Sequence, residues 1–223
     1  MNGPSDSKFK ALVICFDIEH TGQGPYQSDV LSIGANASIL DGEKKSLLRI
    51  PEFSFTIDVF TTKGLSPYSP AAFKAYFTPE ARRAGRPFSV VIKTFCGLIC
   101  ATKKAHSVSN VWLVGHDVYK SEAVVLDAQC ARLKIDFAAL LATAGVTAWV
   151  DTLNLARKQV DLASLESKTL GSIYSHLFRK DLKSAHDAQC DADATQVINP
   201  NKPNNPPSCM LFHFFLSISR KWL

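Results

Sequence analysis

A short apolar run near the N-terminus, residues 11–16 (ALVICF), constrains the fold most. It is short and contains β-branched residues, which is typical of a strand covered on both faces rather than of a long helix. Residues 111–115 (VWLVG) have the same character and predict a second buried strand. A chain with such strands is expected to place helices against its sheet.

The order of the other elements predicts an α/β fold. Residues 29–40 and 54–60 alternate like strands of a meander. Helical patterns and one more strand follow: helices at 70–84, 87–104, about 121–133, 152–159, 169–178 and 185–198, and a strand at 147–150. Strands that first form hairpins and then alternate with helices indicate a mixed sheet flanked by helices on both faces.

The chain is predicted to hold one domain over 11–198, between an N-terminal tail, 1–10, and a C-terminal segment, 199–223. Residues 199–208 (NPNKPNNPPS) form a breaker-rich linker that ends the last helix. The apolar tail after it is too short to span a bilayer, and no run reaches the roughly 20 apolar residues of a membrane span. The N-terminus shows no signal-peptide core, so nothing directs the chain to a membrane.

Composition is that of an ordinary globular protein, with 46% hydrophobic and 20% charged residues, which disfavours disordered and membrane classes. A net charge of +5 is compatible with a polyanionic partner but does not require one. The 6 cysteines include no C-x-x-C pair, which indicates a reducing intracellular compartment, either cytoplasmic or nuclear. Cys96, Cys100 and His106 lack a fourth zinc ligand, so core packing is the preferred interpretation.

Two carboxylates, Asp17 and Glu19, follow the first apolar run in the stretch CFDIEHTG. Residues i and i+2 of a strand point to the same face, so the two anions should lie side by side and attract a cation. Gly22 and Gly24 end the strand in a turn, which leaves the pair accessible at the edge of the sheet. An isolated D-x-E pair is more often a turn cap beside a solvated side chain, so a metal site requires a second acidic cluster.

Residues 185–195 (AHDAQCDADAT) supply that second cluster, with His186 five residues before Asp191. This separation does not share one face of an ideal helix, so we expect His186 in the entering loop, Asp191 in the first turns and Asp187 as a cap. Residues 111–126 supply a third, because the strand ending at His116 leads to Glu122 on a helix. Three separate strand or helix ends therefore deliver carboxylates, and one of them also delivers a histidine.

These motifs resemble those of the DEDDh three-prime to five-prime exonucleases of the ribonuclease H-like superfamily. FDIEHTG, residues 16–22, is similar to the first motif F-D-x-E-T-T-G, and AHDAQCDADAT is similar to the third, H-x-A-x-x-D. AGRPFSVVIKTF, WVDTLNLAR and KTLGSIYSHLF are similar to stretches that the family carries in the same order. The resemblance spans about residues 11–198 and implies a ribonuclease H-like fold and hydrolysis of DNA or RNA from a three-prime end.

The middle motif departs from the family. There, G-H-N is followed by an aspartate five or six residues after the histidine, whereas here Asp117 follows His116, and Ser121 and Glu122 occupy those spacings. The longer spacing resembles the three-prime repair exonuclease branch, so Glu122 is assigned the role of the aspartate. Asp117 and Asp127 remain alternatives.

The resemblance also implies a site of two divalent ions, Mg²⁺ or Mn²⁺, for which carboxylate oxygens are suitable ligands. Asp17 would bridge both ions, Glu19 and Asp191 would bind the ion that activates water, and Glu122 would support the second ion. His186 would be the general base, since an imidazole with a pKa of ~6.5 is mostly neutral at pH 7.

The other histidines, and the enzymatic interpretation itself, have alternatives. His186 could merely cap the last helix, His116 is as easily a hydrogen-bonded turn residue, and His20 replaces a residue that is usually threonine in the family. The middle motif also favours an inactive relative that binds nucleic-acid ends without cutting, and the apolar tail favours a protein-interaction module. The combination of Asp17, Glu19, Asp191 and His186 favours the enzyme over both.

Overall fold

A computed structural model describes residues 9–44, 46–158, 160–182 and 186–197. The predicted linker and tail over 199–223, and most of the N-terminal tail over 1–10, lie outside the described residues. No helix in these ranges is long and apolar enough to cross a membrane.

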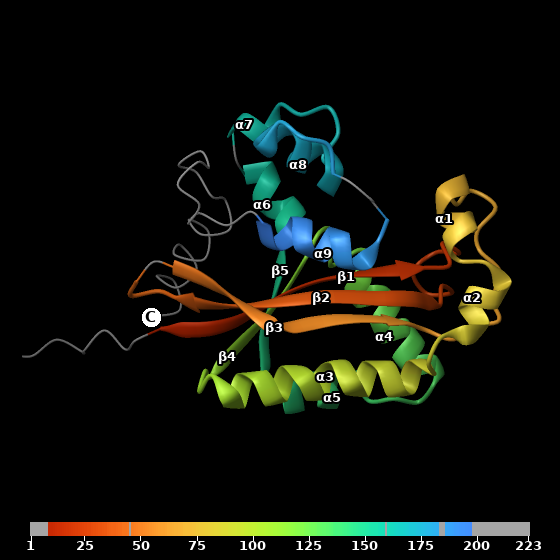
Figure 1. The fold of residues 1–223 in the computed structure, drawn as a ribbon, viewed down its shortest axis with the longest axis horizontal. Helices are drawn as coiled ribbons and strands as arrows, with labels where there is room; N and C mark the ends of the chain where they lie inside the picture. Colours follow the sequence, from red (N-terminus) through yellow and green to blue (C-terminus); the bar gives the residue numbers. More distant parts are fainter. Residues whose placement is uncertain (1–8, 45, 159, 183–185, 198–223) are drawn as a thin grey trace, which may run out of the picture.

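One mixed sheet of five strands has the order β3-β2-β1-β4-β5 (Figure 1). The strands are β1 (Lys10–His20), β2 (Val30–Asp41), β3 (Ser46–Asp58), β4 (Asn110–Gly115) and β5 (Val146–Asp151). The first three form an antiparallel meander, whereas β4 and β5 run parallel to β1. This confirms the predicted mixed sheet, because hairpin loops join antiparallel strands and the longer helical connections join parallel ones.

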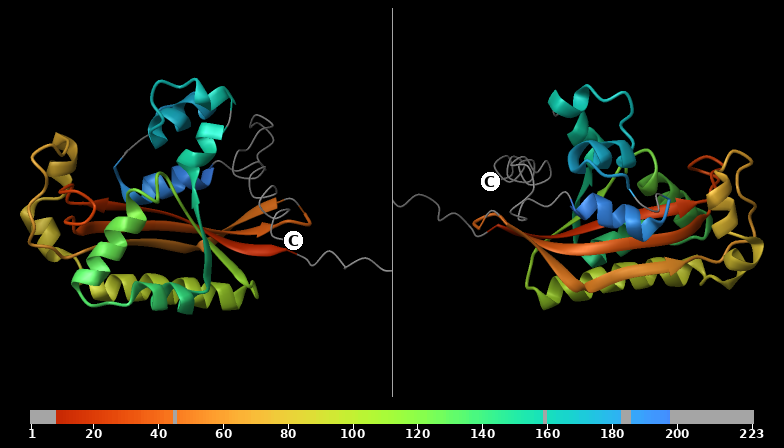
Figure 2. Two further views of the ribbon diagram at one scale, coloured as in Figure 1. Left: turned by 180° about the vertical axis from the view of Figure 1, so that it is seen from behind. Right: turned by 45° about the horizontal axis from the view of Figure 1, so that its top comes forward.

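Helices cover both faces of the sheet, as predicted. On one face lie α3 (Phe88–Ala105), α4 (Glu122–Arg132) and α5 (Phe137–Ala144). The other face carries α6 (Thr152–Lys158), α7 (Val160–Ala163), α8 (Leu170–Phe178) and α9 (Ala188–Val197) (Figure 2). Two short helices, α1 (Ala71–Tyr76) and α2 (Pro79–Ala84), stand beyond the end of the sheet.

The alternation of β1 decides which side chains reach which layer. Its even-numbered residues Leu12, Ile14 and Phe16 belong to the buried cluster beneath α3, α4 and α5. Odd-numbered Val13 and Cys15 belong to the cluster on the opposite face. Full burial of a large aliphatic or aromatic side chain contributes about 1.5–3 kcal/mol, so this two-sided packing strongly determines the register. The next odd-numbered residues of the strand are Asp17 and Glu19.

Four elements differ from the prediction, and one of them, the short helix α7, was not predicted. The helix expected at 70–84 is two helices, because Pro79 lacks the backbone N–H that would continue α1, and the Thr78 hydroxyl accepts a hydrogen bond from the Ala81 N–H to begin α2. Strand β3 starts at Ser46 instead of 54, since Pro51 lies in a bulge on an edge strand, where a missing donor is tolerated. Helix α5 was not predicted, although Asp136 and Gly145 are ordinary cap residues for its two ends.

Candidate active site

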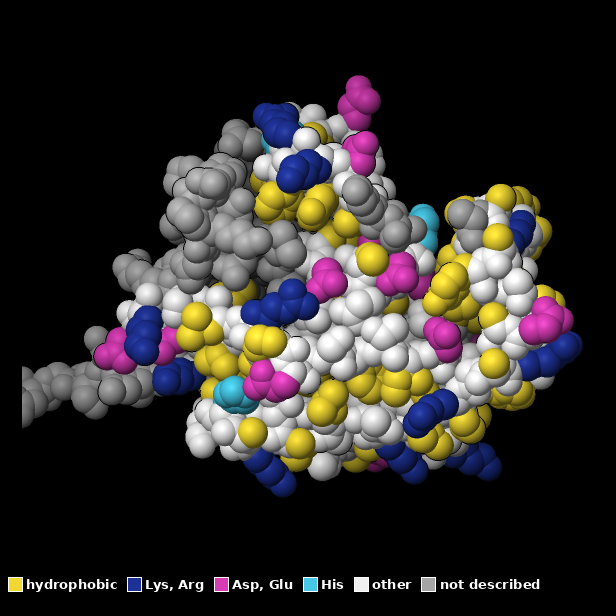
Figure 3. All heavy atoms as spheres, viewed as in Figure 1, with side chains coloured by type: hydrophobic (Ala, Val, Ile, Leu, Met, Phe, Trp, Pro, Cys, Tyr) yellow, Lys and Arg dark blue, Asp and Glu magenta, His cyan; other side chains and the backbone are white. Residues whose placement is uncertain are grey.

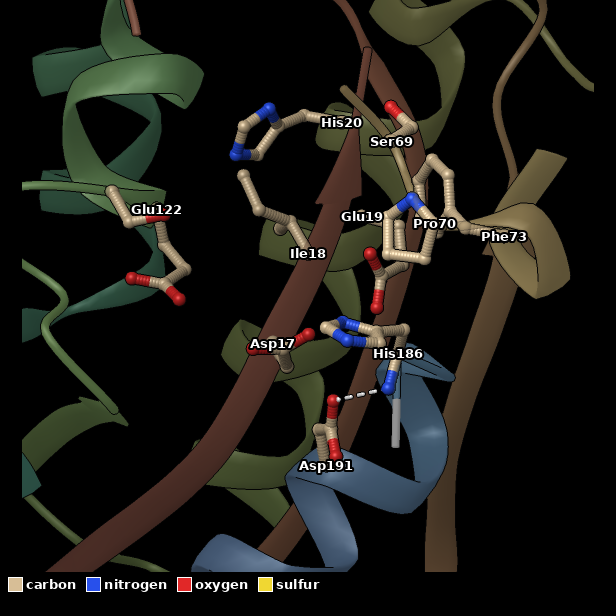
Figure 4. A pocket seen from close by; sticks show the side chains of 11 residues that line it. Asp17, Ile18, Glu19, His20, Ser69, Pro70, Phe73, Glu122, His186 and Asp191 are labelled. Atoms are coloured by element: carbon tan, nitrogen blue, oxygen red, sulfur yellow. Dashed lines mark hydrogen bonds between the residues drawn. The ribbon is translucent and has the colours of Figure 1, made fainter. Parts of the chain in front are cut away.

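Asp17 and Glu19 project from the C-terminal end of β1, beyond the last residue of that strand that pairs with β4. The β1–β4 pairing stops at Cys15 opposite Val114, so no neighbouring strand flanks the acidic pair on that side. One carboxylate oxygen from each of Asp17, Glu19 and Asp191 lies within 4.8 Å of the other two (Figure 4). The structure therefore brings Asp191 to an acidic pair from which more than 170 residues separate it in the sequence.

The N-terminal end of α9 positions Asp191 and His186. Asp187 accepts hydrogen bonds from the backbone N–H groups of Gln189 and Cys190, both at 3.0 Å, and so caps the helix as predicted. His186 lies in the entering loop with a φ of 72°, and its backbone N–H donates to Asp191 Oδ2 at 3.0 Å. This loop turns the His186 side chain toward Asp17 and Glu19 (Figure 4).

Close approach of α9 to the sheet depends on Gly34 of β2, the residue that pairs with Asp17. A Cβ atom at position 34 would lie 2.3 Å from the carbonyl carbon of Ala188, the first residue of α9. Polar contacts hold the helix in this place, because Asp193 accepts from Asn36 Nδ2 at 2.6 Å and from Arg49 at 3.1 Å. Sequence reasoning missed these contacts, although a glycine inside a strand often marks the close approach of another backbone.

Gly34→Ala is expected to destabilise the protein by about 1–3 kcal/mol, the usual cost of overpacking, and to displace α9 with Asp191. Chemical denaturation measures the free energy of unfolding, and Mn²⁺ titration measures the affinity of the site for Mn²⁺. Gly97→Ala is the matched control, since a Cβ at this position in α3 meets nothing within 4 Å and alanine is the better helix former. An unchanged Mn²⁺ affinity in Gly34→Ala would contradict the dependence of Asp191 on this contact.

Glu122 approaches the same site from the first turn of α4. Its side chain is 4% exposed, and together with Ser121 it lines a cavity of about 280 Å³ that Asp17, Glu19, His186 and Asp191 also line. The two alternatives lie elsewhere: Asp127 is exposed on α4, and the backbone N–H of Asp117 donates to Asp151 at 2.9 Å. Of the three candidates in the middle motif, Glu122 alone lines this cavity.

The two remaining histidines occupy different environments. His116 bridges Thr152 Oγ1 and the carbonyl oxygen of Lys168, both at 2.9 Å, and does not line the cavity. These contacts connect the end of β4 with the loop before α8, which is a structural role. His20 does line the cavity, and its Nδ1 accepts from the Gly22 N–H at 3.1 Å.

Comparison with known proteins finds relatives in structure. No protein-family model matches the chain, and no curated protein matches it in sequence. A solved structure of exonuclease I superposes with a TM-score of 0.66 at 17% identity, over 92% of this chain and 43% of that chain. The chain shares the fold of exonuclease I. This confirms the predicted ribonuclease H-like class.

Two further structures agree. E. coli exonuclease I in complex with a dT13 oligonucleotide has a TM-score of 0.62 at 17% identity, over 85% of this chain and 40% of that chain. Exonuclease I without ligand also has a TM-score of 0.62 at 17% identity, over 97% of this chain and 46% of that chain. The chain thus spans less than half the length of these exonuclease I structures, and identities this low show the fold alone.

The electrostatics of the carboxylate cavity favour a bound cation. Burial, and then the charges of Glu122, Glu19 and Asp191, raise the pKa of Asp17 well above its usual range. Burial and the Asp191 charge raise the pKa of Glu19 to about 8, and burial raises that of Glu122 to about 7. No lysine or arginine lines the cavity within the described ranges.

Two buried carboxylate oxygens without hydrogen-bond partners indicate whether the residues of the cavity suit divalent ions. Among the residues that the structure describes, Asp191 Oδ1 and Glu122 Oε2 have no hydrogen-bond partner. Leaving a buried carboxylate oxygen without a partner is costly, and a hard cation would satisfy it. The partnerless oxygens and the all-carboxylate donor set therefore fit Mg²⁺ or Mn²⁺.

The burial of Glu19 beside other carboxylates should make protein stability depend on pH. In the metal-free protein the folded state holds the Glu19 proton up to about pH 8, whereas the usual pKa is 4.5, so the free energy of unfolding falls as pH rises between these values. Ions bind the deprotonated carboxylates, so Mn²⁺ should raise the thermal midpoint most at the upper end of this range. Thermal unfolding with chelator or Mn²⁺ checks both expectations, and Glu19→Gln should flatten the slope. A metal-free midpoint that rises over the same range would refute them.

Proposed function

We propose that this chain is a divalent-metal-dependent three-prime to five-prime exonuclease of the DEDDh type, acting on single-stranded DNA or RNA. The observation that carries the proposal is the meeting of Asp17, Glu19 and Asp191 within 4.8 Å, in a cavity that Glu122 and His186 also line. Similarity to the fold of E. coli exonuclease I, which has been solved in complex with dT13, supports a nucleic-acid substrate.

Asp17, Glu19, Asp191 and Glu122 would hold two divalent ions through their carboxylate oxygens. When bound, such ions lower the pKa of water and neutralise charge on the departing three-prime oxygen. The protein contributes a rigid arrangement of ligands, because Asp17 and Glu19 belong to a central strand and Asp191 to a capped helix. A site on regular elements keeps its geometry better than one on loops.

His186 would accept the proton of the attacking water. The Oδ2 atom of Asp191 holds the backbone of His186 but leaves its imidazole free to point into the cavity. Attack on the last phosphodiester forms a bond from the water oxygen to phosphorus, breaks the bond to the three-prime oxygen and releases a nucleoside monophosphate. The shortened strand then carries a new three-prime hydroxyl.

A second candidate is a protein that binds nucleic-acid ends without cutting them. Glu122 and Asp117, which stand in place of aspartate and asparagine in the middle motif, favour it. The partnerless oxygens of Glu122 and Asp191 favour the enzyme, since binding without chemistry has no need for buried carboxylates that repel one another.

The test is digestion of single-stranded DNA and RNA labelled at the five-prime end. With Mg²⁺ or Mn²⁺ we expect stepwise shortening from the three-prime end and release of monophosphates, whereas chelator should stop the reaction. Circular and three-prime-blocked strands should survive, and Asp17→Asn is the inactive control. Equal cutting of blocked and open strands would overturn the end-directed mechanism, and binding without cutting would select the second candidate.

A further inference from the structure

Residues 60–86, between β3 and α3, form a basic lobe at the end of the sheet, here called the platform. It contains Lys63, Lys74, Arg82, Arg83 and Arg86 but a single acidic residue, Glu80. Its net charge of +4 is therefore most of the +5 carried by the whole chain. Lys74, Arg83 and Arg86 are exposed and form no ion pair with another described residue.

The platform borders the proposed active site directly. Ser69, Pro70 and Phe73 line the same cavity as the carboxylates. A strand whose three-prime end enters the cavity therefore has this surface beside it.

The platform is held firmly against the rest of the fold. Phe73 and Phe77 pack with Leu31 of β2 in a buried cluster of their own. The Ser66 N–H donates to the carbonyl oxygen of Thr21 at 2.7 Å, and the Arg82 side chain donates to the carbonyl oxygens of Lys63 and Phe77. Its surface side chains therefore start from a preorganised backbone, which lowers the entropic cost of binding.

Exposed aromatic side chains concentrate at this end of the molecule. Tyr68 is 94% exposed, Tyr76 59% and Phe60 43%. Tyr26 is also exposed, in the β1–β2 loop that contacts the platform through the bond from Gln23 to the Gly64 carbonyl oxygen. Only Tyr119, of the exposed large aromatic residues in the described ranges, lies elsewhere. In Figure 3, hydrophobic side chains cover α1 and face acidic and histidine side chains across a hollow.

Aromatic rings interleaved with basic side chains match the chemistry of single-stranded nucleic acid. Bases stack on such rings at about 1–3 kcal/mol each, without regard to sequence, and lysine or arginine follows the phosphates. The adjacent cavity is lined by carboxylates and, in the described part of the chain, by no lysine or arginine, so it offers a polyanion little attraction unless ions are bound. The platform supplies the missing positive charge.

We infer that the platform holds the unpaired strand behind its three-prime end, with bases stacked on Tyr68 and Tyr76 and phosphates beside Lys74, Arg83 and Arg86. The inference rests on the proposed function, because the strand held by the platform is the one whose end enters the cavity. It adds to that function the surface that would select an unpaired strand, since duplex DNA keeps its bases stacked inside and cannot use the tyrosines.

Binding without cutting tests the stacking contacts. A labelled single strand of about 12 nucleotides, within the range that such surfaces occupy, is titrated with protein in chelator and followed by fluorescence anisotropy. Tyr68→Leu and Tyr76→Leu should each weaken binding about 5- to 100-fold, the equivalent of one lost stack. Tyr68→Phe and Tyr76→Phe, which keep the ring, should bind like the parent protein. Equal affinity of the leucine and phenylalanine variants would overturn the stacking role.

Salt dependence tests the phosphate contacts. Lys74→Gln and Arg83→Gln should each reduce the slope of log affinity against log salt by about 0.7, the value for one single-strand phosphate. Lys93→Gln and Lys104→Gln remove the same charge from exposed positions of α3, on the face of the sheet opposite α9, and should leave the slope unchanged. Equal effects at all four positions would mean that net charge, and not the platform, attracts the strand.

The outcomes separate this inference from the proposed function. If the parent protein trims three-prime ends while the leucine variants bind normally, the platform is overturned and the exonuclease stands. If the parent protein never trims three-prime ends but the leucine variants lose binding, the platform stands and the proposed exonuclease activity is overturned. Failure of the parent protein to bind any single strand would overturn the inference outright.

Discussion

His186→Ala is expected to lower the rate of phosphodiester hydrolysis by about 10²- to 10⁴-fold, the usual contribution of a general base, with little change in Mn²⁺ affinity. The two effects separate because His186 contacts Asp191 through its backbone N–H, which alanine retains. Asp191 therefore keeps its hydrogen bond when the imidazole is removed. Single-turnover digestion measures the rate, and calorimetric titration measures the affinity for Mn²⁺.

A second substitution controls for a change in the backbone conformation at position 186. The φ of 72° at position 186 lies in the left-handed region, which asparagine adopts more readily than alanine. His186→Asn should therefore keep the loop and still lose the rate, because its amide cannot accept a proton at neutral pH. Near-parental turnover in both variants would reduce His186 to a helix-entry residue.

Glu122→Gln is expected to lower the hydrolysis rate by about 10- to 100-fold, the range seen when a group supporting a metal ligand is removed. The same change should raise the thermal midpoint of the metal-free protein, because the Glu122 charge contributes to raising the pKa of Asp17. Activity that falls while stability rises is the signature of a charge kept for ion binding. Digestion and thermal unfolding in chelator measure the two quantities.

Conservative and neighbouring substitutions complete this comparison. Glu122→Asp should keep or increase the rate, since a water between this carboxylate and the second ion would adjust its position to a side chain that is one methylene shorter. Asp127→Asn should have little effect, because Asp127 is exposed and lies outside the cavity. If Glu122→Gln cuts at the parental rate while Asp117→Asn or Asp127→Asn abolishes cutting, the fourth carboxylate belongs to the residue whose loss abolished it.

Local patterns predicted much of the fold. The two apolar runs became the neighbouring strands β1 and β4, and the layer of helices on each face followed from the order of the elements. The errors occurred where tertiary context changes the meaning of a residue. Pro51 interrupts a strand pattern, yet an edge strand tolerates it. Helix α5 was missed because its eight residues, nearly all apolar, show little periodicity between their caps.

The sequence by itself determined which side chains share a face and where the caps lie. Strand alternation puts Asp17 and Glu19 side by side, and the spacing from His186 to Asp191 requires a loop before the helix. Only the tertiary structure decided that Asp191 meets this pair, that Glu122 lines the cavity whereas Asp117 and Asp127 do not, and that the platform borders the cavity. The reason is physical: periodicity is a property of one backbone segment, whereas the distance between segments depends on how closely two backbones pack, here on the missing Cβ of Gly34 beneath α9.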